Sequence, residues 1–213
     1  MRLIDAGLRE GHAYTVREDW LTPPNLITLA RFGLVPVFVW LTTSGEYLTA
    51  FIVLAVLSCT DWVDGYVARR FDMMSTVGAW LDPAADRLSL MVVAVTLVGT
   101  GIAPLWFALA VIVPDLVLAA VSAWLFRGSP ELTVTVLGKV RTAILLAGAP
   151  ALLLSRVPEA DTAVWTAVSL VLVAAGSILH VAATLDYLRR AVAKAVALRA
   201  AGVDPRDRAA WAG

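Results

Sequence analysis

The stretch SCTDWVDGYVARRFDMMSTVGAWLDPAADRLSL, residues 58–90, decides the interpretation of this chain because it places acids within an apolar sequence. Four of its aspartates form two spaced pairs, Asp61 with Asp64 and Asp82 with Asp86. Residues three or four apart in a helix lie on one face, so each pair shares a helix face. Apolar segments flank the stretch on both sides. Placing a carboxylate among apolar, membrane-spanning residues costs free energy, so such a carboxylate is a candidate functional residue.

The composition is that of a membrane protein. Of 213 residues, 60% are apolar and 16% are charged, and the mean hydropathy is +0.80. Soluble domains carry about 45–50% apolar and about 25% charged residues. The formal net charge of zero gives no field that would attract nucleic acid, so nucleic acid is not expected as a partner. A single cysteine, Cys59, excludes an internal disulfide framework.

Six segments are long and apolar enough to be membrane spans, since about 20 helical residues cross a bilayer core. They cover about 26–44, 48–68, 80–100, 103–126, 139–156 and 163–188, and clusters of Gly, Pro and Ser separate most of them. A soluble protein of this length could not bury six such helices. The predicted fold class is therefore an all-α integral membrane protein with six transmembrane helices.

Three regions follow from this division. Residues 1–24 form a polar juxtamembrane arm, residues 25–188 the six-helix domain, and residues 189–213 an Ala-rich basic tail. The tail is either a helix lying on anionic headgroups or a solvated end.

Basic residues predict the orientation of the spans. If both termini lie on one side, every lysine and arginine except Arg156 falls on that side or in its half of the membrane. Positive residues mark the cytoplasmic face. We therefore expect a multi-pass protein of the plasma membrane whose termini and acidic stretch are cytoplasmic.

Two interpretations of the four aspartates are open. They could be polar helix ends paired with Arg69, Arg70 and Arg87. The alternative is a metal site, because four converging carboxylates repel unless a cation joins them, and Mg²⁺ or Mn²⁺ prefers oxygen ligands. Their shared faces and their depth favour the metal site.

The neighbours of the aspartates suit a phosphoryl-transfer site. Gly65, Ala68 and Gly78 lie about one turn away and leave room for a ligand. Arg69 supplies a cation suited to a diphosphate bridged by metal ions.

These residues carry a resemblance to a known family, the CDP-alcohol phosphotransferases. The matching signature reads Asp61-x-x-Asp64-Gly65-x-x-Ala68-Arg69, then eight residues, then Gly78-x-x-x-Asp82-x-x-x-Asp86. Two weaker similarities are PNLITLAR at residues 24–31 and GKVRT at residues 138–142. In the second, arginine replaces the second lysine of the family's Gly-Lys-x-Lys-Thr. The resemblance covers about residues 20–190.

The resemblance implies a transferase that joins a CDP-linked lipid, CDP-diacylglycerol, to an alcohol and releases CMP, often as a homodimer. Asp61, Asp64, Asp82 and Asp86 would hold two divalent ions, Mg²⁺ or Mn²⁺, and Asp86 would also be the general base. The nucleotide and its diphosphate would be bound by a second set of residues, comprising Gly65, Ala68, Arg69, Ser75 and Gly78. Lys139 and Arg141 are the candidates for binding the acceptor.

The signature does not identify the acceptor alcohol, so other residues must be used to infer it. Family members that use glycerol 3-phosphate carry an Arg-Glu pair early in the fourth helix and a Gln after the Gly-Lys-x-Lys-Thr stretch. Here these stretches read VIVPDLVLAA and GKVRTAILLAG, and both features are missing. The second stretch is similar to the family's cardiolipin synthases, whose acceptor is the membrane lipid phosphatidylglycerol. We therefore expect that acceptor, with a phosphatidylglycerophosphate synthase as the alternative.

Three further interpretations stay open. Asp115, within the fourth span, is either part of a site or a structural carboxyl, and His180 in the sixth span fits a packing histidine better than a catalytic one. A proton- or cation-coupled transporter would also use buried acids, but it would place them near the bilayer midplane and often in repeated halves, neither of which is found.

Overall fold

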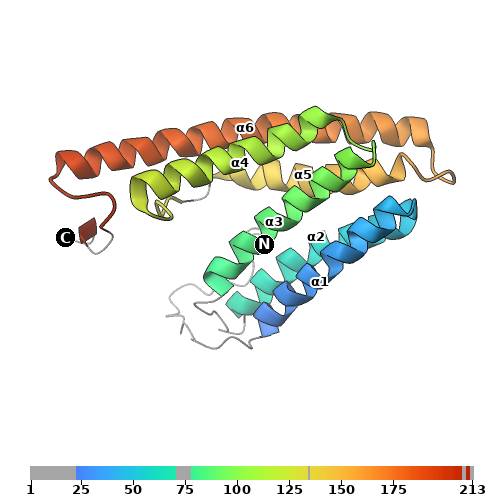
Figure 1. Cartoon of the computed structure of the whole chain (residues 1–213), viewed down its shortest axis with the longest axis horizontal. Helices are drawn as coiled ribbons and strands as arrows, with labels where there is room; N and C mark the ends of the chain where they lie inside the picture. Colours follow the sequence, from blue (N-terminus) through green and yellow to red (C-terminus); the bar gives the residue numbers. More distant parts are fainter. Residues whose placement is uncertain (1–22, 71–77, 134, 208–209, 212–213) are drawn as a thin grey trace. The chain divides into compact units, whose positions relative to one another are not determined.

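The computed structural model describes residues 23–70, 78–133, 135–207 and 210–211, without the side chains of residues 23–25, 27, 60–70 and 78–86. Within these residues it contains six helices, which confirms the all-α class (Figure 1). They are α1 Pro23–Thr43, α2 Tyr47–Arg70, α3 Gly78–Gly99, α4 Leu105–Phe126, α5 Val136–Leu154 and α6 Thr162–Ala200.

Three of these helices, α4, α5 and α6, are long and apolar enough to cross a membrane. The described apolar parts of α1, α2 and α3 are shorter, at Thr28–Thr43, Tyr47–Cys59 and Arg87–Gly99. Each predicted segment corresponds to one helix, whereas the six-span topology stays a prediction. The boundaries predicted for the arm, the domain and the tail are likewise untested.

The chain divides into two compact units, residues 1–103 with 150–166, and residues 104–149 with 167–213. In the first unit, α1 packs against both α2 and α3. Gly45 and Gly101, with φ of 82° and 70°, make the turns that end α1 and α3, because glycine adopts positive φ without steric cost. The Arg156 guanidinium donates to the Gly101 carbonyl, so the α5–α6 loop and the α3–α4 turn lie together.

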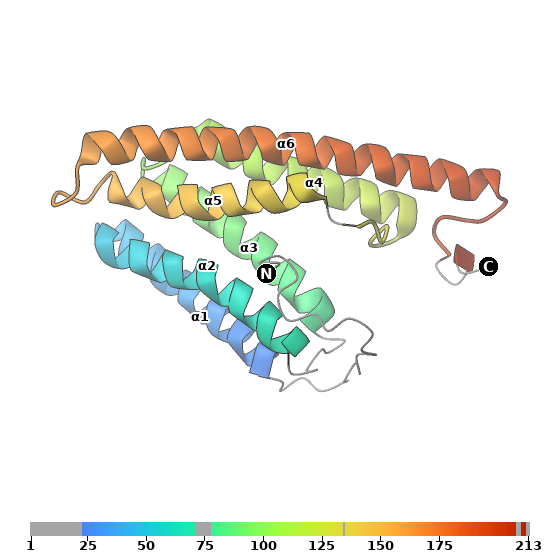
Figure 2. The same ribbon diagram turned by 180° about the vertical axis from the view of Figure 1, so that it is seen from behind.

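The second unit is built from α4 and most of α5 and α6, and α6 runs alongside α5 (Figure 2). Close approach of α5 and α6 depends on glycines. A Cβ added at Gly148 would lie 3.0 Å from Val173 Cγ1 and 3.2 Å from its backbone nitrogen. A Cβ at Gly176 would meet the Leu145 side chain at 2.7 Å. Small residues at such positions let helix backbones approach closely.

The basic tail begins inside α6, which continues without a break to Ala200. Gly202, with φ of 77°, then reverses the chain, and the Val203 N–H bonds the Leu198 carbonyl at 2.9 Å. This pattern is that of a Schellman cap.

The chain after α6 returns to the end of α4, a packing that the sequence did not indicate. The Trp211 ring meets Phe126 edge-on at 5.6 Å between centroids, and the Lys194 ammonium lies 4.2 Å from the Trp211 centroid. Arg206 donates two hydrogen bonds to the Trp124 carbonyl, at 3.1 and 3.2 Å. A cation at the C-terminus of a helix is favourable because unpaired carbonyls carry negative charge there. Part of the basic tail therefore serves the fold.

The glycine contacts lead to a prediction about stability. Gly148→Ala should lower the melting temperature of the purified protein in detergent, because the new methyl group meets a β-branched side chain and backbone. Overpacking of this kind costs about 1–3 kcal/mol. Gly33→Ala is the matched control, since nothing lies within 4 Å of its Cβ position in α1. An equal or higher melting temperature for Gly148→Ala would show that α5 and α6 are not in close contact there.

Candidate functional site

The four aspartates of the signature lie on two helices. Asp61 and Asp64 are in the second half of α2, and Asp82 and Asp86 are in the first half of α3. The backbone is helical through all four positions, so the spacing that gives each pair a shared helix face is present. Their side chains are outside the described part of the structure, and the convergence of the two pairs stays a prediction.

The predicted nucleotide-binding residues are near the same helix ends. Gly65, Ala68 and Arg69 are in the last turns of α2, and Gly78 is the first residue of α3. Ser75 lies outside the described residues. Among the side chains that are described, no group of three histidines, cysteines or acids could hold a metal ion. The signature aspartates are not among those side chains, so their predicted metal site is not tested.

A buried cation lies on the helix that both aspartate helices contact. Arg31 of α1 is only 3% exposed, and Thr28 one turn earlier is completely buried. A buried charge is stable only beside groups that compensate it. The sequence placed Arg31 in a motif similarity without a role, and its burial is the signal that only the structure supplies.

The GKVRT segment forms the first two turns of α5. The Thr135 hydroxyl accepts a hydrogen bond from the Gly138 N–H at 3.2 Å, which is the contact of an N-cap residue with the third helical position. The Thr142 hydroxyl donates to the Gly138 carbonyl at 3.0 Å. Thr135 thus fixes the start of the helix that carries Lys139 and Arg141.

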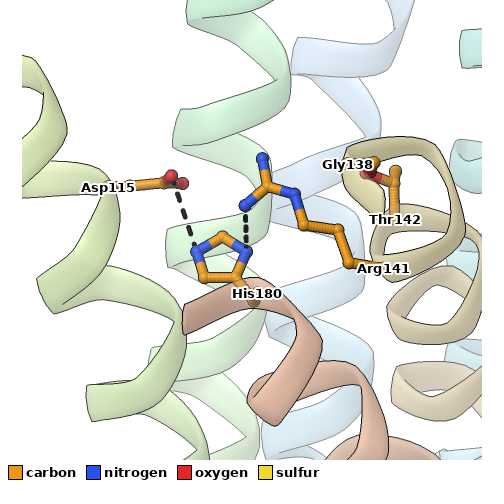
Figure 3. Close-up of polar contacts among 5 residues, drawn as sticks. All are labelled: Asp115, Gly138, Arg141, Thr142 and His180. Carbon is orange, nitrogen blue, oxygen red and sulfur yellow. Dashed lines mark hydrogen bonds and ion pairs between the residues drawn. The ribbon is translucent and has the colours of Figure 1, made fainter. Parts of the chain in front are cut away.

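Three ionisable side chains from three helices meet in the second unit (Figure 3). Nη1 of Arg141 on α5 lies 2.6 Å from Nδ1 of His180 on α6. On the other side of the ring, His180 Nε2 lies 3.5 Å from Asp115 Oδ1 on α4. His180 and Asp115 are buried, at 2% and 7% exposed.

This contact bears on three of the residues singled out in the sequence. His180 is a buried histidine whose Nδ1 contacts Arg141, while Nε2 faces Asp115 at 3.5 Å without a hydrogen bond among the described residues. Arg141, a predicted acceptor-binding residue, joins them, while Lys139 is half-buried on the same helix. The signal in the sequence was an ionisable residue in each of three consecutive apolar segments, Asp115, Arg141 and His180. Nothing in the sequence paired them.

Comparison with known proteins gives one family and several relatives. Residues 21–179 match the sequence profile of the CDP-alcohol phosphatidyltransferase family. The chain is 39% identical over 142 residues to the cardiolipin synthase (CMP-forming) of Streptomyces coelicolor, covering 63% of this chain and 66% of that relative. It is 32% identical over 167 residues to the CDP-diacylglycerol–glycerol-3-phosphate 3-phosphatidyltransferase of Bacillus subtilis, covering 68% and 86%. The chain thus spans just under two thirds of the length of the Streptomyces relative.

The cap at Thr135 gives a local prediction. Thr135→Ala should speed amide hydrogen exchange in the first turn of α5, because loss of an N-cap hydroxyl costs about 0.5–2 kcal/mol of helix stability. Thr142→Ala is the control from the same helix, since its hydroxyl bonds a carbonyl that the helix already uses. Equal exchange rates in the two variants would remove Thr135 as the residue that fixes this helix start.

Proposed function

The chain belongs to the CDP-alcohol phosphatidyltransferase family, and from that premise we propose that it is an enzyme of phospholipid biosynthesis. It transfers a phosphatidyl group from CDP-diacylglycerol to an alcohol acceptor and releases CMP. The observation that carries this proposal is the complete signature from Asp61 to Asp86, within the matched residues and on two helices that pack against α1. The family match favours this activity over a cation-coupled transporter.

Two divalent ions, Mg²⁺ or Mn²⁺, suit the acids of the signature. Carboxylate oxygens are the ligands that these hard cations prefer. Asp61, Asp64, Asp82 and Asp86 would hold the ions, whose charge offsets that of the diphosphate when they are bound. Helical backbone at all four positions supports this assignment because it keeps each pair of acids on a shared face. Gly65, Ala68, Arg69, Ser75 and Gly78 would bind the nucleotide and its diphosphate.

The reaction is a substitution at phosphorus. The acceptor hydroxyl oxygen attacks the phosphorus that carries diacylglycerol, and a new P–O bond forms. The bond from that phosphorus to the bridging oxygen breaks, and CMP leaves with this oxygen. Asp86 takes the hydroxyl proton as general base, a role that contributes typically 10²–10⁴-fold in rate.

Phosphatidylglycerol is our proposed acceptor, which makes the protein a cardiolipin synthase. The Streptomyces relative bears that name, whereas the Bacillus relative is named for glycerol 3-phosphate, the alternative acceptor. The Arg-Glu pair and the Gln that accompany glycerol 3-phosphate are absent from α4 and α5. The exposed side chains of α4 include Leu105, Leu109 and Leu116, and such a surface suits the chains of a lipid acceptor. Lys139 and Arg141 would bind its phosphate.

We further propose a plasma-membrane protein of six spans with both termini and the signature acids in the cytoplasm, acting as a homodimer as in the family. The contact of Arg156 with Gly101 supports this topology, because it joins two loops that the six-span arrangement places on the outer side. In the second unit, Arg190 and Lys194 donate to the Thr133 and Pro130 carbonyls. These contacts join the α4–α5 loop to the far half of α6, as expected on the cytoplasmic side.

The acceptor can be tested directly. Purified protein with CDP-diacylglycerol and Mg²⁺ is offered phosphatidylglycerol, glycerol 3-phosphate, inositol phosphate and serine separately, and CMP release is followed. We expect the fastest release with phosphatidylglycerol. Asp86→Asn should lower turnover at least 10²-fold, since the general base is lost, while CDP-diacylglycerol still binds. Turnover with glycerol 3-phosphate alone would establish the alternative acceptor, and near-native turnover of Asp86→Asn would exclude Asp86 as the base.

The topology gives a separate prediction. In a Cys59→Ser background, a cysteine replacing Glu159 should react with an impermeant thiol reagent added to intact cells, and one replacing Ser129 should be protected. Both positions are exposed on the protein surface, so the membrane alone decides their access. Reaction at Ser129→Cys with protection at Glu159→Cys would reverse the orientation.

A further inference from the structure

Helix α6 is longer than a membrane span needs. A bilayer core is about 30 Å thick, and the 22 residues of α4, at about 1.5 Å each, match that thickness. Helix α6 has 39 residues. Its last turns lie beside the end of α4, because Ala191 and Ala195 are buried in one cluster with Leu125 and Phe126. If α4 spans the bilayer, these turns of α6 lie at the membrane boundary that the end of α4 marks.

Hydrogen bonds hold the same part of the chain at the end of α4. The Lys194 ammonium donates to the Pro130 carbonyl at 2.9 Å, and the Arg206 guanidinium donates to the Trp124 carbonyl at 3.1 and 3.2 Å. The chain after α6 turns back towards α4 to make the second contact (Figure 1). The Trp124 side chain is 66% exposed, and tryptophan is enriched where a membrane meets water.

One face of these turns of α6 is exposed and largely apolar. Its members follow one another at intervals of four, three, four and three residues, the spacing that keeps side chains on one side of a helix. The three apolar members are between 47% and 58% exposed, and the two arginines are exposed as well. These residues, the 185–199 face, are Leu185, Arg189, Val192, Val196 and Arg199.

The two arginines of the 185–199 face are not used by the fold. Arg190, Lys194 and Arg206 each donate to a backbone carbonyl of α4 or of the loop after it. By contrast, Arg189 and Arg199 are exposed, and no hydrogen bond or ion pair joins them to another described residue. The face carries no acid. Its positive charge is therefore available to an anion outside the chain.

This composition suits the headgroup layer of an anionic bilayer better than other surroundings. Exposed valines are unfavourable in water, and arginines are costly in the hydrocarbon core. A twofold interface would use this patch on both copies of the chain, and the arginines of the two copies would then repel each other. At the membrane boundary both requirements are met, since arginine keeps its charge among headgroups while apolar side chains lie against the acyl chains.

We propose that the 185–199 face is a docking surface for anionic phospholipids of the surrounding bilayer. Val192 and Val196 lie against the acyl chains next to the headgroups, and Arg189 and Arg199 bind the lipid phosphates. The lipid bound here is not a reactant. The inference thus rests on the proposed spans of α4 and α6 and does not depend on the reaction or on its acceptor.

Affinity for phosphatidylserine tests the role of the charges. This lipid is anionic, and its headgroup has no free hydroxyl that could make it an acceptor. Its binding to the purified protein in detergent is titrated by native mass spectrometry and compared with that of zwitterionic phosphatidylcholine. The wild type should prefer phosphatidylserine. Combined Arg189→Gln and Arg199→Gln should lower the affinity for it about 25-fold, at about fivefold for each arginine.

The matched control keeps the charges in place. Combined Arg189→Lys and Arg199→Lys has the same charge at the same positions and should retain the preference for phosphatidylserine. Both side chains are exposed, so neither pair of substitutions should change the melting temperature of the lipid-free protein. An unchanged affinity for phosphatidylserine in the glutamine variant would overturn the proposal.

The position of the face is tested in nanodiscs that contain phosphatidylserine. In a Cys59→Ser background, a bimane fluorophore attached to a cysteine that replaces Val196 should be quenched by spin-labelled lipids and protected from iodide in the water. A cysteine that replaces Ala201 is the control. Ala201 is exposed and lies five residues after Val196, a spacing that leaves the face. There the fluorophore should be quenched by iodide.

Two outcomes of this experiment would overturn the proposal. Equal quenching by iodide at the two positions would show that the 185–199 face is solvated. A disulfide between two copies at Val196→Cys would assign the face to a second copy of the chain. CMP release tests the proposed function separately, because loss of turnover leaves both lipid measurements interpretable.

Discussion

An ionised side chain inside an apolar layer of helices must be compensated there, because leaving a charge unpaired away from water costs several kcal/mol. In the second unit one imidazole, His180, contributes to that compensation, with Asp115 on one side of the ring and Arg141 on the other. The contact ties α4, α5 and α6 together at a single point, with one side chain from each helix. Replacing His180 by an apolar residue would remove both the contact with Asp115 and the contact with Arg141. This bridge therefore contributes, together with apolar packing, to the register of the three helices.

Close packing of α5 and α6 makes the bridge possible. Gly148 and Gly176 have no room for a Cβ without displacing Val173 or Leu145, so the two helix backbones approach closely on the side of His180. Bulkier residues at these positions would separate the helices and lengthen the contact between Arg141 and His180. The contact between Arg141 and His180 thus depends on the small residues that let α5 and α6 pack closely.

Much of the fold could be predicted from the sequence because its signals are local. Pro23, Gly45 and Gly101 mark helix starts and turns, and the length of each apolar segment gives the helix between them. The end of α6 is different. The basic run after Tyr187 suggests a tail, but alanines favour helix and Ala191 and Ala195 are buried in the packing. Contacts with the α4–α5 loop, distant in the sequence, then stabilise the extension.

The residues of the candidate site also differ in whether local sequence signals could predict them. The signature aspartates are recognisable because spacing within each helix is a local property. The pairing of Asp115 with His180 is not, since it joins residues on different helices and depends on their rotation and approach. The same holds for Arg31, whose burial cannot be read from its place in a motif.

A chemical consequence follows from where the polar residues lie along the chain. The helices that carry the signature acids expose apolar side chains such as Ile52 and Val95 in their described parts, while the acids themselves occupy the adjoining helix ends. A water-soluble nucleotide attached to a lipid needs this division, because its headgroup requires cations and donors and its chains require an apolar surface. An acceptor that is itself a lipid likewise needs a cation for its phosphate beside an apolar surface for its chains. We propose that Arg141, a cation on the largely apolar helix α5, meets that demand.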